Sequence, residues 1–176
     1  MDFAMLILRL VVGALFIGHG TQKLFGWFEG HGLEGTAGFM ESLGYQPGKR
    51  YAAIGGLAEA GGGLLLVLGL LTPLAAVLIV GMMLNAILSV HLENGVWATN
   101  GGYEFPLVMM VAAAAIALAG AGSVSMDSLL GLSRLSGVWG LFGVMLGLLV
   151  GAGAIGTRKT AEGPAEEEAE KEHRAA

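Results

Sequence analysis

Polar side chains that could do chemistry interrupt an otherwise apolar sequence at a few positions. Those inside the apolar runs or at their ends are Arg9, His19, Lys23, Glu59, Asn85, His91 and Glu104. If the runs cross a membrane, an ionisable group within them is costly, and it is kept chiefly where it faces a bundle interior, an opposite charge or a wet cavity. These residues are therefore the first candidates for a functional site.

Three of them offer proton transfer and charge stabilisation. A carboxyl group and an imidazole can exchange protons with a bound substrate, the roles that we predict for Glu59 and His19. An ammonium group can stabilise a developing oxyanion, the role predicted for Lys23. His19 and Lys23 are four residues apart and share a helix face, whereas the short Glu59 side chain cannot easily reach the membrane surface. We predict these three residues as the catalytic candidates.

Each candidate also has a structural interpretation. Lys23, near a helix end, can extend its charge to the lipid headgroups, and a backbone carbonyl can satisfy the His19 ring. Glu59 can be a protonated, hydrogen-bonded spectator. His91 and Glu104, at the ends of apolar runs, can be solvated interface residues. The sequence leaves these alternatives open.

Composition and the lengths of the apolar runs predict an all-α integral membrane protein. Hydrophobic residues make up 55% of the 176-residue chain and charged residues 13%, against roughly 25% charged in soluble domains. A membrane helix needs about 20 mainly apolar residues. Such runs occupy residues 3–25, 51–71, 74–92, 104–121 and 138–156. They predict a polytopic helix bundle inserted in the lipid bilayer of the cell membrane.

The alternating direction of the helices brings most polar residues to one half of the membrane. At 1.5 Å per residue, His19 lies roughly 9 Å and Glu59 about 12 Å below the same surface, while Arg9 falls in the opposite half. We predict a substrate-binding pocket in the shared half, lined by His19, Lys23, Glu59, Asn85, His91 and Glu104.

Three further segments accompany the spans. Residues 27–50 form an interfacial loop, in which a short amphipathic helix is expected from Glu34 to Gly44. Residues 157–176 are rich in charge and poor in apolar side chains, which predicts disorder. The resulting organisation is a four-helix core at 1–130, an additional transmembrane helix at 131–156 and an acidic tail at 157–176.

Glycine is unusually frequent, at 31 of 176 residues, and lies within the apolar runs. Small residues let membrane helices approach closely. Gly143, Gly147 and Gly151 form one such stripe. It fits packing within the chain and a homo-oligomer interface equally well.

The distribution of basic residues predicts the orientation. Lys and Arg favour cytoplasmic loops. With alternating spans, one side carries Lys49, Arg50, Arg158 and Lys159, and the other carries Arg134 outside a span. We therefore expect the N-terminus outside the cell and the C-terminus in the cytoplasm.

The composition also excludes several classes of function. Without cysteine, the chain has no disulfide, CxxC redox pair or thiolate metal site. His19, Glu59, His91 and Glu104 show no ExxH or HxxxH spacing, so we assign no metal and no intrinsic cofactor. Nine scattered Lys and Arg residues and a net charge of −5 argue against nucleic-acid binding.

An ordered set of strings resembles the DoxX/DoxD-like membrane protein family across residues 5–130. These strings are LRLVVGALFIGHGTQKLFGWF, GFMESLGY, AAIGGLAEAGGGLLLVLGLLTPLAA, HLENGVWATNGGYEFPL and AGAGSVSMD. The resemblance implies a four-helix membrane core and adds Tyr103 to the predicted pocket. The matched positions are His19, Gly20, Lys23, Glu59, Gly62, Gly63, His91, Gly101, Gly102, Tyr103 and Glu104. The chain departs from the family in its fifth span and acidic tail, and in AGAGSVSMD, which is looser than the family's usual GPG-type segment.

The resemblance implies function at a coarser level than fold. Founding members of the family are small subunits of an archaeal thiosulfate:quinone oxidoreductase, and bacterial relatives are associated with quinone or thiol stress. We therefore expect a membrane subunit of a quinone-linked oxidoreductase or redox-stress system. Its pocket would bind a quinone head group or a small polar substrate, and the electrons would come from a soluble oxidoreductase partner subunit or from the substrate itself. Eukaryotic relatives imply the alternative, a non-catalytic scaffold, chaperone or cargo receptor. Whether the chain catalyses a reaction by itself stays open.

Overall fold

The computed structural model describes residues 2–159, and all its regular elements are helical. The α-helices are α1 (Asp2–Phe25), α2 (Gly32–Ser42), α3 (Gly48–Leu68), α4 (Thr72–Ala86), α5 (Glu104–Ala119), α6 (Met126–Leu129) and α7 (Val138–Ile155). The other short helices are η1 (Ile87–His91), η2 (Leu92–Asn94), η3 (Ala98–Asn100) and η4 (Ser133–Leu135). Of the expected acidic tail, residues 160–176 lie outside the described part of the chain.

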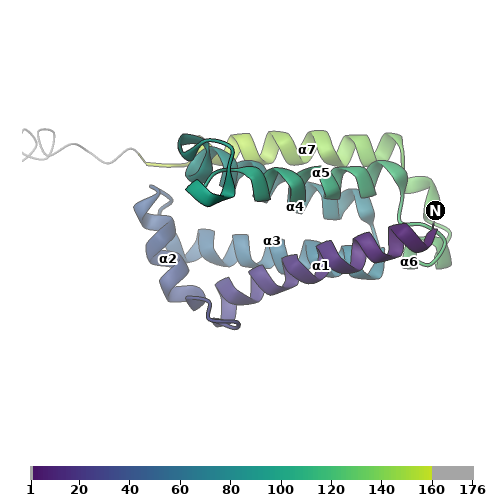
Figure 1. The fold of residues 1–176 in the computed structure, drawn as a ribbon, viewed down its shortest axis with the longest axis horizontal. Coiled ribbons are helices and arrows are strands. Elements are labelled where there is room, and N and C mark those ends of the chain that lie inside the picture. Colours follow the sequence, from purple (N-terminus) through teal and green to yellow (C-terminus); the bar gives the residue numbers. More distant parts are fainter. Residues whose placement is uncertain (1, 160–176) are drawn as a thin grey trace, which may run out of the picture.

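The five longest helices run side by side with alternating directions (Figure 1). Helix α1 packs on α3, and α4 packs on α5 and α7. Helix α2 crosses the end of the bundle where α1 ends and α3 begins, and α6 lies at the other end, near the N-terminus (Figure 1). The two ends of the bundle therefore differ in construction.

Four helices within residues 2–159 are long and apolar enough to cross a membrane. They are α1, α3, the α4–η2 segment Thr72–Asn94, and α7. Helix α5 is apolar but has 16 residues, and is thus about 24 Å long. The predicted fourth span, 104–121, ends early because Gly120 adopts a φ of 90° after Ala119. Fold and composition together define a multi-pass helical membrane protein.

Two predicted helices begin earlier than expected. Helix α3 starts at Gly48 rather than at residue 51, because the extended backbone of Pro47 directly precedes it. It ends before Gly69, whose left-handed conformation (φ 61°) suits a residue without a side chain. Helix α2 occupies Gly32–Ser42, two residues before the expected Glu34–Gly44.

The predicted third span is not a uniform α-helix. Its last part, η1, is a π-helical turn, which then tightens into the 3₁₀ turn η2. Insertions of this kind are frequent at functional sites because they re-aim the side chains that follow. Hydrophobic patterning gave no sign of this change.

Glycines bring α1 and α3 into backbone contact. A Cβ atom on Gly13 would lie 2.6 Å from the carbonyl oxygen of Gly63, and one on Gly20 would lie 2.6 Å from that of Gly56. Atoms cannot approach that closely, so any side chain at these positions would push the helices apart. Close packing of α1 on α3 therefore requires glycine at these positions.

Helix α7 uses its glycine stripe to pack on α4. Gly143, Gly147 and Gly151 are buried. A Cβ on Gly151 would lie 2.5 Å from the carbonyl oxygen of Gly81, and one on Gly147 would lie 3.0 Å from the Val80 side chain. Of the two interpretations of this stripe, the structure favours packing within the chain.

A buried polar cluster closes the end of the bundle near α6. Arg9, 1% exposed, donates hydrogen bonds to the carbonyl oxygens of Val124 (2.5 Å) and Leu66 (3.5 Å). The Asp127 carboxylate accepts hydrogen bonds from the backbone N–H groups of Leu71 (2.8 Å) and Thr72 (3.3 Å). Arg9 of α1 therefore joins α3 to the α5–α6 connection, and Asp127 of α6 fastens that helix to the turn between α3 and α4.

Candidate functional site

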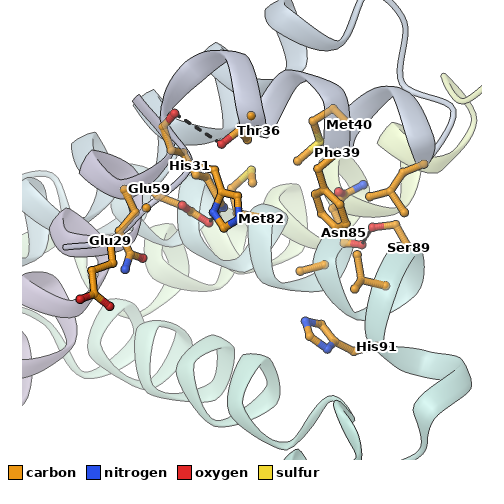
Figure 2. Close-up of a pocket in the computed structure, with 17 residues that line it drawn as sticks. Glu29, His31, Thr36, Phe39, Met40, Glu59, Met82, Asn85, Ser89 and His91 are labelled. Atoms are coloured by element: carbon orange, nitrogen blue, oxygen red, sulfur yellow. Dashed lines mark hydrogen bonds and ion pairs between the residues drawn. The ribbon is translucent and has the colours of Figure 1, made fainter. Parts of the chain in front are cut away.

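A cavity of about 650 Å³ lies at the end of the bundle crossed by α2 (Figure 2). The end of α1, helices α2, α3 and α4, and η1 contribute to its wall. Its polar lining residues are Gln22, Lys23, Glu29, His31, Thr36, Glu59, Asn85, Ser89 and His91. Phe39, Met40, Leu43 and Met82 supply much of its apolar wall. The cavity thus combines hydrogen-bonding groups with apolar surface, as sites for small organic molecules do.

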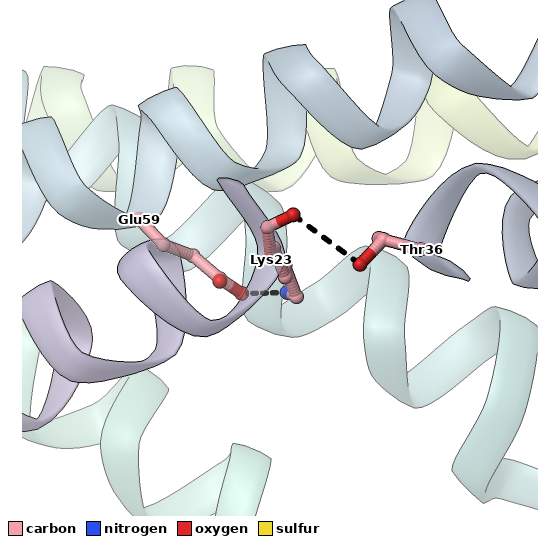
Figure 3. Close-up of polar contacts among 3 residues, drawn as sticks. All are labelled: Lys23, Thr36 and Glu59. Carbon is pink, nitrogen blue, oxygen red and sulfur yellow. Dashed lines mark hydrogen bonds and ion pairs between the residues drawn. The ribbon is translucent and has the colours of Figure 1, made fainter. Parts of the chain in front are cut away.

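Lys23 of α1 and Glu59 of α3 form an ion pair in this cavity (Figure 3). The Glu59 side chain is 3% exposed and that of Lys23 is 28% exposed. The Thr36 hydroxyl donates a hydrogen bond of 3.5 Å to the Lys23 carbonyl oxygen, which ties α2 to the end of α1. The lysine charge offsets the free-energy cost of burying the carboxylate. Lys23 therefore points toward Glu59 and not toward the lipid headgroups.

One carboxylate oxygen of this pair is left over. Glu59 Oε1 contacts Lys23, but the buried Oε2 has no hydrogen-bond partner among residues 2–159. A buried acceptor without a partner carries a free-energy cost. Because Glu59 lines the cavity, a ligand with an O–H or N–H group can satisfy Oε2 there.

The third span contributes three polar residues to the cavity, two of them from the π-helical turn. Asn85, Ser89 and His91 all line it. The Ser89 hydroxyl donates to the Asn85 carbonyl (2.6 Å), an acceptor near the break in the helical hydrogen bonding. His91 Nδ1 lies 2.7 Å from the Gly101 carbonyl oxygen. A carbonyl only accepts, so Nδ1 carries a proton, and in a neutral ring Nε2 is an acceptor.

The structure brings together four of the seven predicted pocket residues. Lys23, Glu59, Asn85 and His91 line the cavity, as expected from their depths, and His19, Tyr103 and Glu104 do not.

The remaining three residues have other contacts. The His19 ring lies against Phe105 of α5, with 5.8 Å between centroids. The Glu104 carboxylate accepts a hydrogen bond of 3.0 Å from the Ala98 backbone N–H, within the α4–α5 connection. Tyr103 precedes α5, and its N–H donates to the Gly95 carbonyl (3.1 Å). The structure therefore places His19 against α5, and Tyr103 and Glu104 in the α4–α5 connection, outside the lining of this cavity.

Sequence reasoning missed the contribution of the α1–α2 segment. Gln22, Glu29, His31 and Thr36 line the cavity from the end of α1, the following loop and α2. The available signal was the amphipathic helix itself, whose apolar face requires a partner at the membrane surface. That partner is the same bundle end that carries Lys23 and Glu59.

The described residues hold no cluster of three or more His, Asp or Glu side chains arranged to bind a metal ion. The chemistry evident in the cavity is that of an ion pair, an unpartnered carboxylate oxygen and several hydrogen-bonding groups.

Comparison with known proteins places this membrane protein in a family. The DoxX family model matches residues 4–92, which include α1, α2, α3 and most of the third span. The chain belongs to the DoxX family. The matched segment contains the four pocket residues Lys23, Glu59, Asn85 and His91.

A similar protein from Bacillus subtilis (strain 168) carries the name "Putative oxidoreductase CatD". It is 30% identical over 128 residues, which cover 72% of this chain and 86% of the relative. No solved structure matches the chain.

Proposed function

We propose that this chain is the membrane subunit of a quinone-linked oxidoreductase, and that its cavity binds the quinone head group. The observation that carries the proposal is the buried Lys23–Glu59 pair with its unpartnered Oε2 in a cavity of mixed polarity. A quinol ring has hydroxyl donors at its edge and an apolar face, which this lining complements. The oxidoreductase name of the relative supports the same class.

The cavity groups have complementary roles in this proposal. Reduction of a quinone takes two electrons and two protons. The cysteine-free chain takes the electrons from a redox-active partner subunit. Lys23 stabilises negative charge on a quinone oxygen as the electrons arrive, and Glu59 Oε2 accepts a hydrogen bond from the hydroxyl group that forms. Both protons come through the cavity from water.

A structural role is the competing account. A buried ion pair between two helices can also hold a scaffold, chaperone or cargo receptor together, with no ligand in the cavity. Loss of the pair would then reduce protein abundance or client recovery, without a separate redox phenotype.

Mass spectrometry of the complex, purified in mild detergent through a C-terminal tag, tests the proposal. Both lipids and proteins are identified, and an unrelated membrane protein with the same tag is the control. We expect quinone and a soluble oxidoreductase at stoichiometric levels. Recovery of neither, or of unrelated membrane clients, would contradict the proposal and support the scaffold account.

A further inference from the structure

A second cavity, an apolar groove of about 230 Å³, lies beside the polar one. Helices α3 and α7 both pack on α4, and they flank the groove. Its walls include Ile54 and Ala58 of α3, Val77 and Leu78 of α4, and Val150 of α7. Side chains at its outer edge are open to the surroundings of the bundle, with Ile54 63% and Val150 53% exposed. The groove therefore communicates with the lipid phase.

The groove and the polar cavity are adjacent, separated by side chains that line both. Met40, Met82 and Asn85 line both. The Asn85 amide donates a hydrogen bond of 2.6 Å to the buried Tyr45 hydroxyl, which lies on the groove side. Met82 has a flexible, unbranched side chain and lies near Glu59 in the close-up (Figure 2). A rotamer change of Met82 would therefore let one molecule have its head beside Glu59 and its tail in the groove.

We propose that the groove binds the hydrophobic tail of the quinone whose head group occupies the polar cavity. This inference rests on the function proposed above and specifies the substrate class as a lipid-soluble, prenylated quinone. It predicts that the tail leaves the protein between α3 and α7 and continues into the bilayer.

Charge distinguishes this ligand from a phospholipid. Lys23 is the lysine or arginine that lines the cavity, and its charge is already paired with Glu59. A lipid phosphate would therefore have to compete with the Glu59 carboxylate for Lys23, whereas Glu59 Oε2, which has no partner among the described residues, suits a neutral hydroxyl donor. A neutral ring suits the polar cavity and a hydrocarbon tail suits the apolar groove, whereas a water-soluble quinone without a tail would leave the groove unused.

The test compares two quinols with the same ring, one without a tail and one with a short prenyl tail. Binding to purified protein in detergent is measured by equilibrium dialysis, with empty micelles as the correction for partitioning. The prenylated quinol should bind wild type at least about tenfold more tightly. Ala58→Phe, which fills the groove, should remove this advantage and leave binding of the tail-less quinol within about twofold. Leu57→Phe, at a neighbouring position with 63% exposure, is the control and should retain it.

A photoreactive group at the tail end gives a second measurement on the unaltered protein. Labelling should map to residues 51–58, 77–82 and 150–154. Labelling elsewhere would refute the assignment of the groove as the tail site and leave the proposed function intact. The same conclusion would follow if Ala58→Phe still bound the prenylated quinol more tightly than the tail-less one by the wild-type factor. Failure of wild type to bind either quinol would overturn both. If Ala58→Phe binds neither quinol, the variant has lost its fold and the labelling map decides.

Discussion

At the scale of single residues, the site depends on a charge pair that only tertiary structure can create. Lys23 and Glu59 are 36 residues apart and meet because glycines bring α1 against α3. The pair leaves one carboxylate oxygen without a partner. Lys23 therefore balances the charge of Glu59, while Oε2 keeps a hydrogen-bonding capacity that no described residue uses.

Breaking this pair should destabilise the protein. Lys23→Met leaves the Glu59 carboxylate buried without a counter-charge, a loss on the order of 3 kcal/mol when one partner of a buried pair is removed. The partial exposure of Lys23 makes this an upper estimate. We expect a lower midpoint of thermal unfolding, measured by size-exclusion chromatography after heating in detergent.

The double variant Lys23→Met/Glu59→Gln should recover part of this loss, since it leaves no unpaired charge at this position. Lys49→Met is a matched control, because it breaks an ion pair with Glu34 whose two side chains are 61% and 77% exposed. Its midpoint should not change measurably. An equal loss in Lys23→Met and Lys49→Met would contradict the buried-pair account.

Substitutions of Asn85 and His19 compare a residue that lines the cavity with one that lies outside its lining. Asn85→Leu removes a lining amide and the hydrogen bond to Tyr45. Quinol affinity should fall about tenfold. His19→Leu should change it by less than about twofold, since the ring faces Phe105. Equilibrium dialysis measures both. A tenfold loss in His19→Leu would favour the proton-transfer role predicted from its spacing with Lys23.

At the scale of helices, close packing through glycine positions the site. Gly20 lies on α1 one turn before Lys23, and a Cβ there would clash with the Ala60 nitrogen at 2.5 Å. Gly18, on the same helix, has open space around it. The two glycines therefore have different functions, although their sequence context is similar.

Gly20→Ala should separate α1 from α3 and lower the unfolding midpoint, together with quinol affinity. Gly18→Ala should leave both unchanged or raise stability by up to about 1 kcal/mol, because alanine favours helix more than glycine does. Thermal unfolding and dialysis on the same preparations check this. Equal behaviour of the two variants would show that close packing at Gly20 is not required.

Helix-scale features also show how far the sequence predicts the structure. Runs of about 20 apolar residues identified four long helices, and the start of α5 at Glu104 was predicted correctly. The π-helical turn at Ile87–His91 and the short helix α6 were missed. A π turn arises from competition among tertiary contacts and leaves no hydrophobic periodicity. Glu59 and Asn85, which the sequence places at similar distances from one end of the bundle, line the same cavity. His19 does not line it, because its ring faces Phe105, a direction that spacing along the sequence does not reveal.

At the scale of the whole molecule, the end of α7 is attached to the cavity end of the bundle. The Arg158 side chain donates a hydrogen bond of 2.5 Å to the Leu43 carbonyl, and the Lys159 N–H donates one of 2.8 Å to the Gly44 carbonyl. Lys49 and Arg50 lie at this end too, at the start of α3. From this concentration of basic residues and the expected cytoplasmic C-terminus, we propose that the cavity opens to the cytoplasm.

Labelling of introduced cysteines tests this orientation, because the chain has none of its own. Ser42 and Ser133 are exposed. Ser42 is the last residue of α2, and Ser133 begins η4, which packs against α6; α2 and α6 lie at opposite ends of the bundle (Figure 1). A membrane-impermeant maleimide added to intact cells should label Ser133→Cys and leave Ser42→Cys unlabelled until the cells are opened. The reverse pattern would place the cavity outside the cytoplasm.

The most direct test of the central claim is quinol binding to wild type and to Glu59→Gln. The variant replaces a charge-assisted hydrogen bond of about 1.5–3 kcal/mol by a neutral one of about 0.5–1.5 kcal/mol, which predicts an affinity lower by about five- to tenfold. Glu34→Gln, whose carboxylate is exposed and paired with Lys49, is the control and should bind like wild type. Equal affinities of wild type and Glu59→Gln would contradict the assignment of Glu59 as the group that receives the quinol.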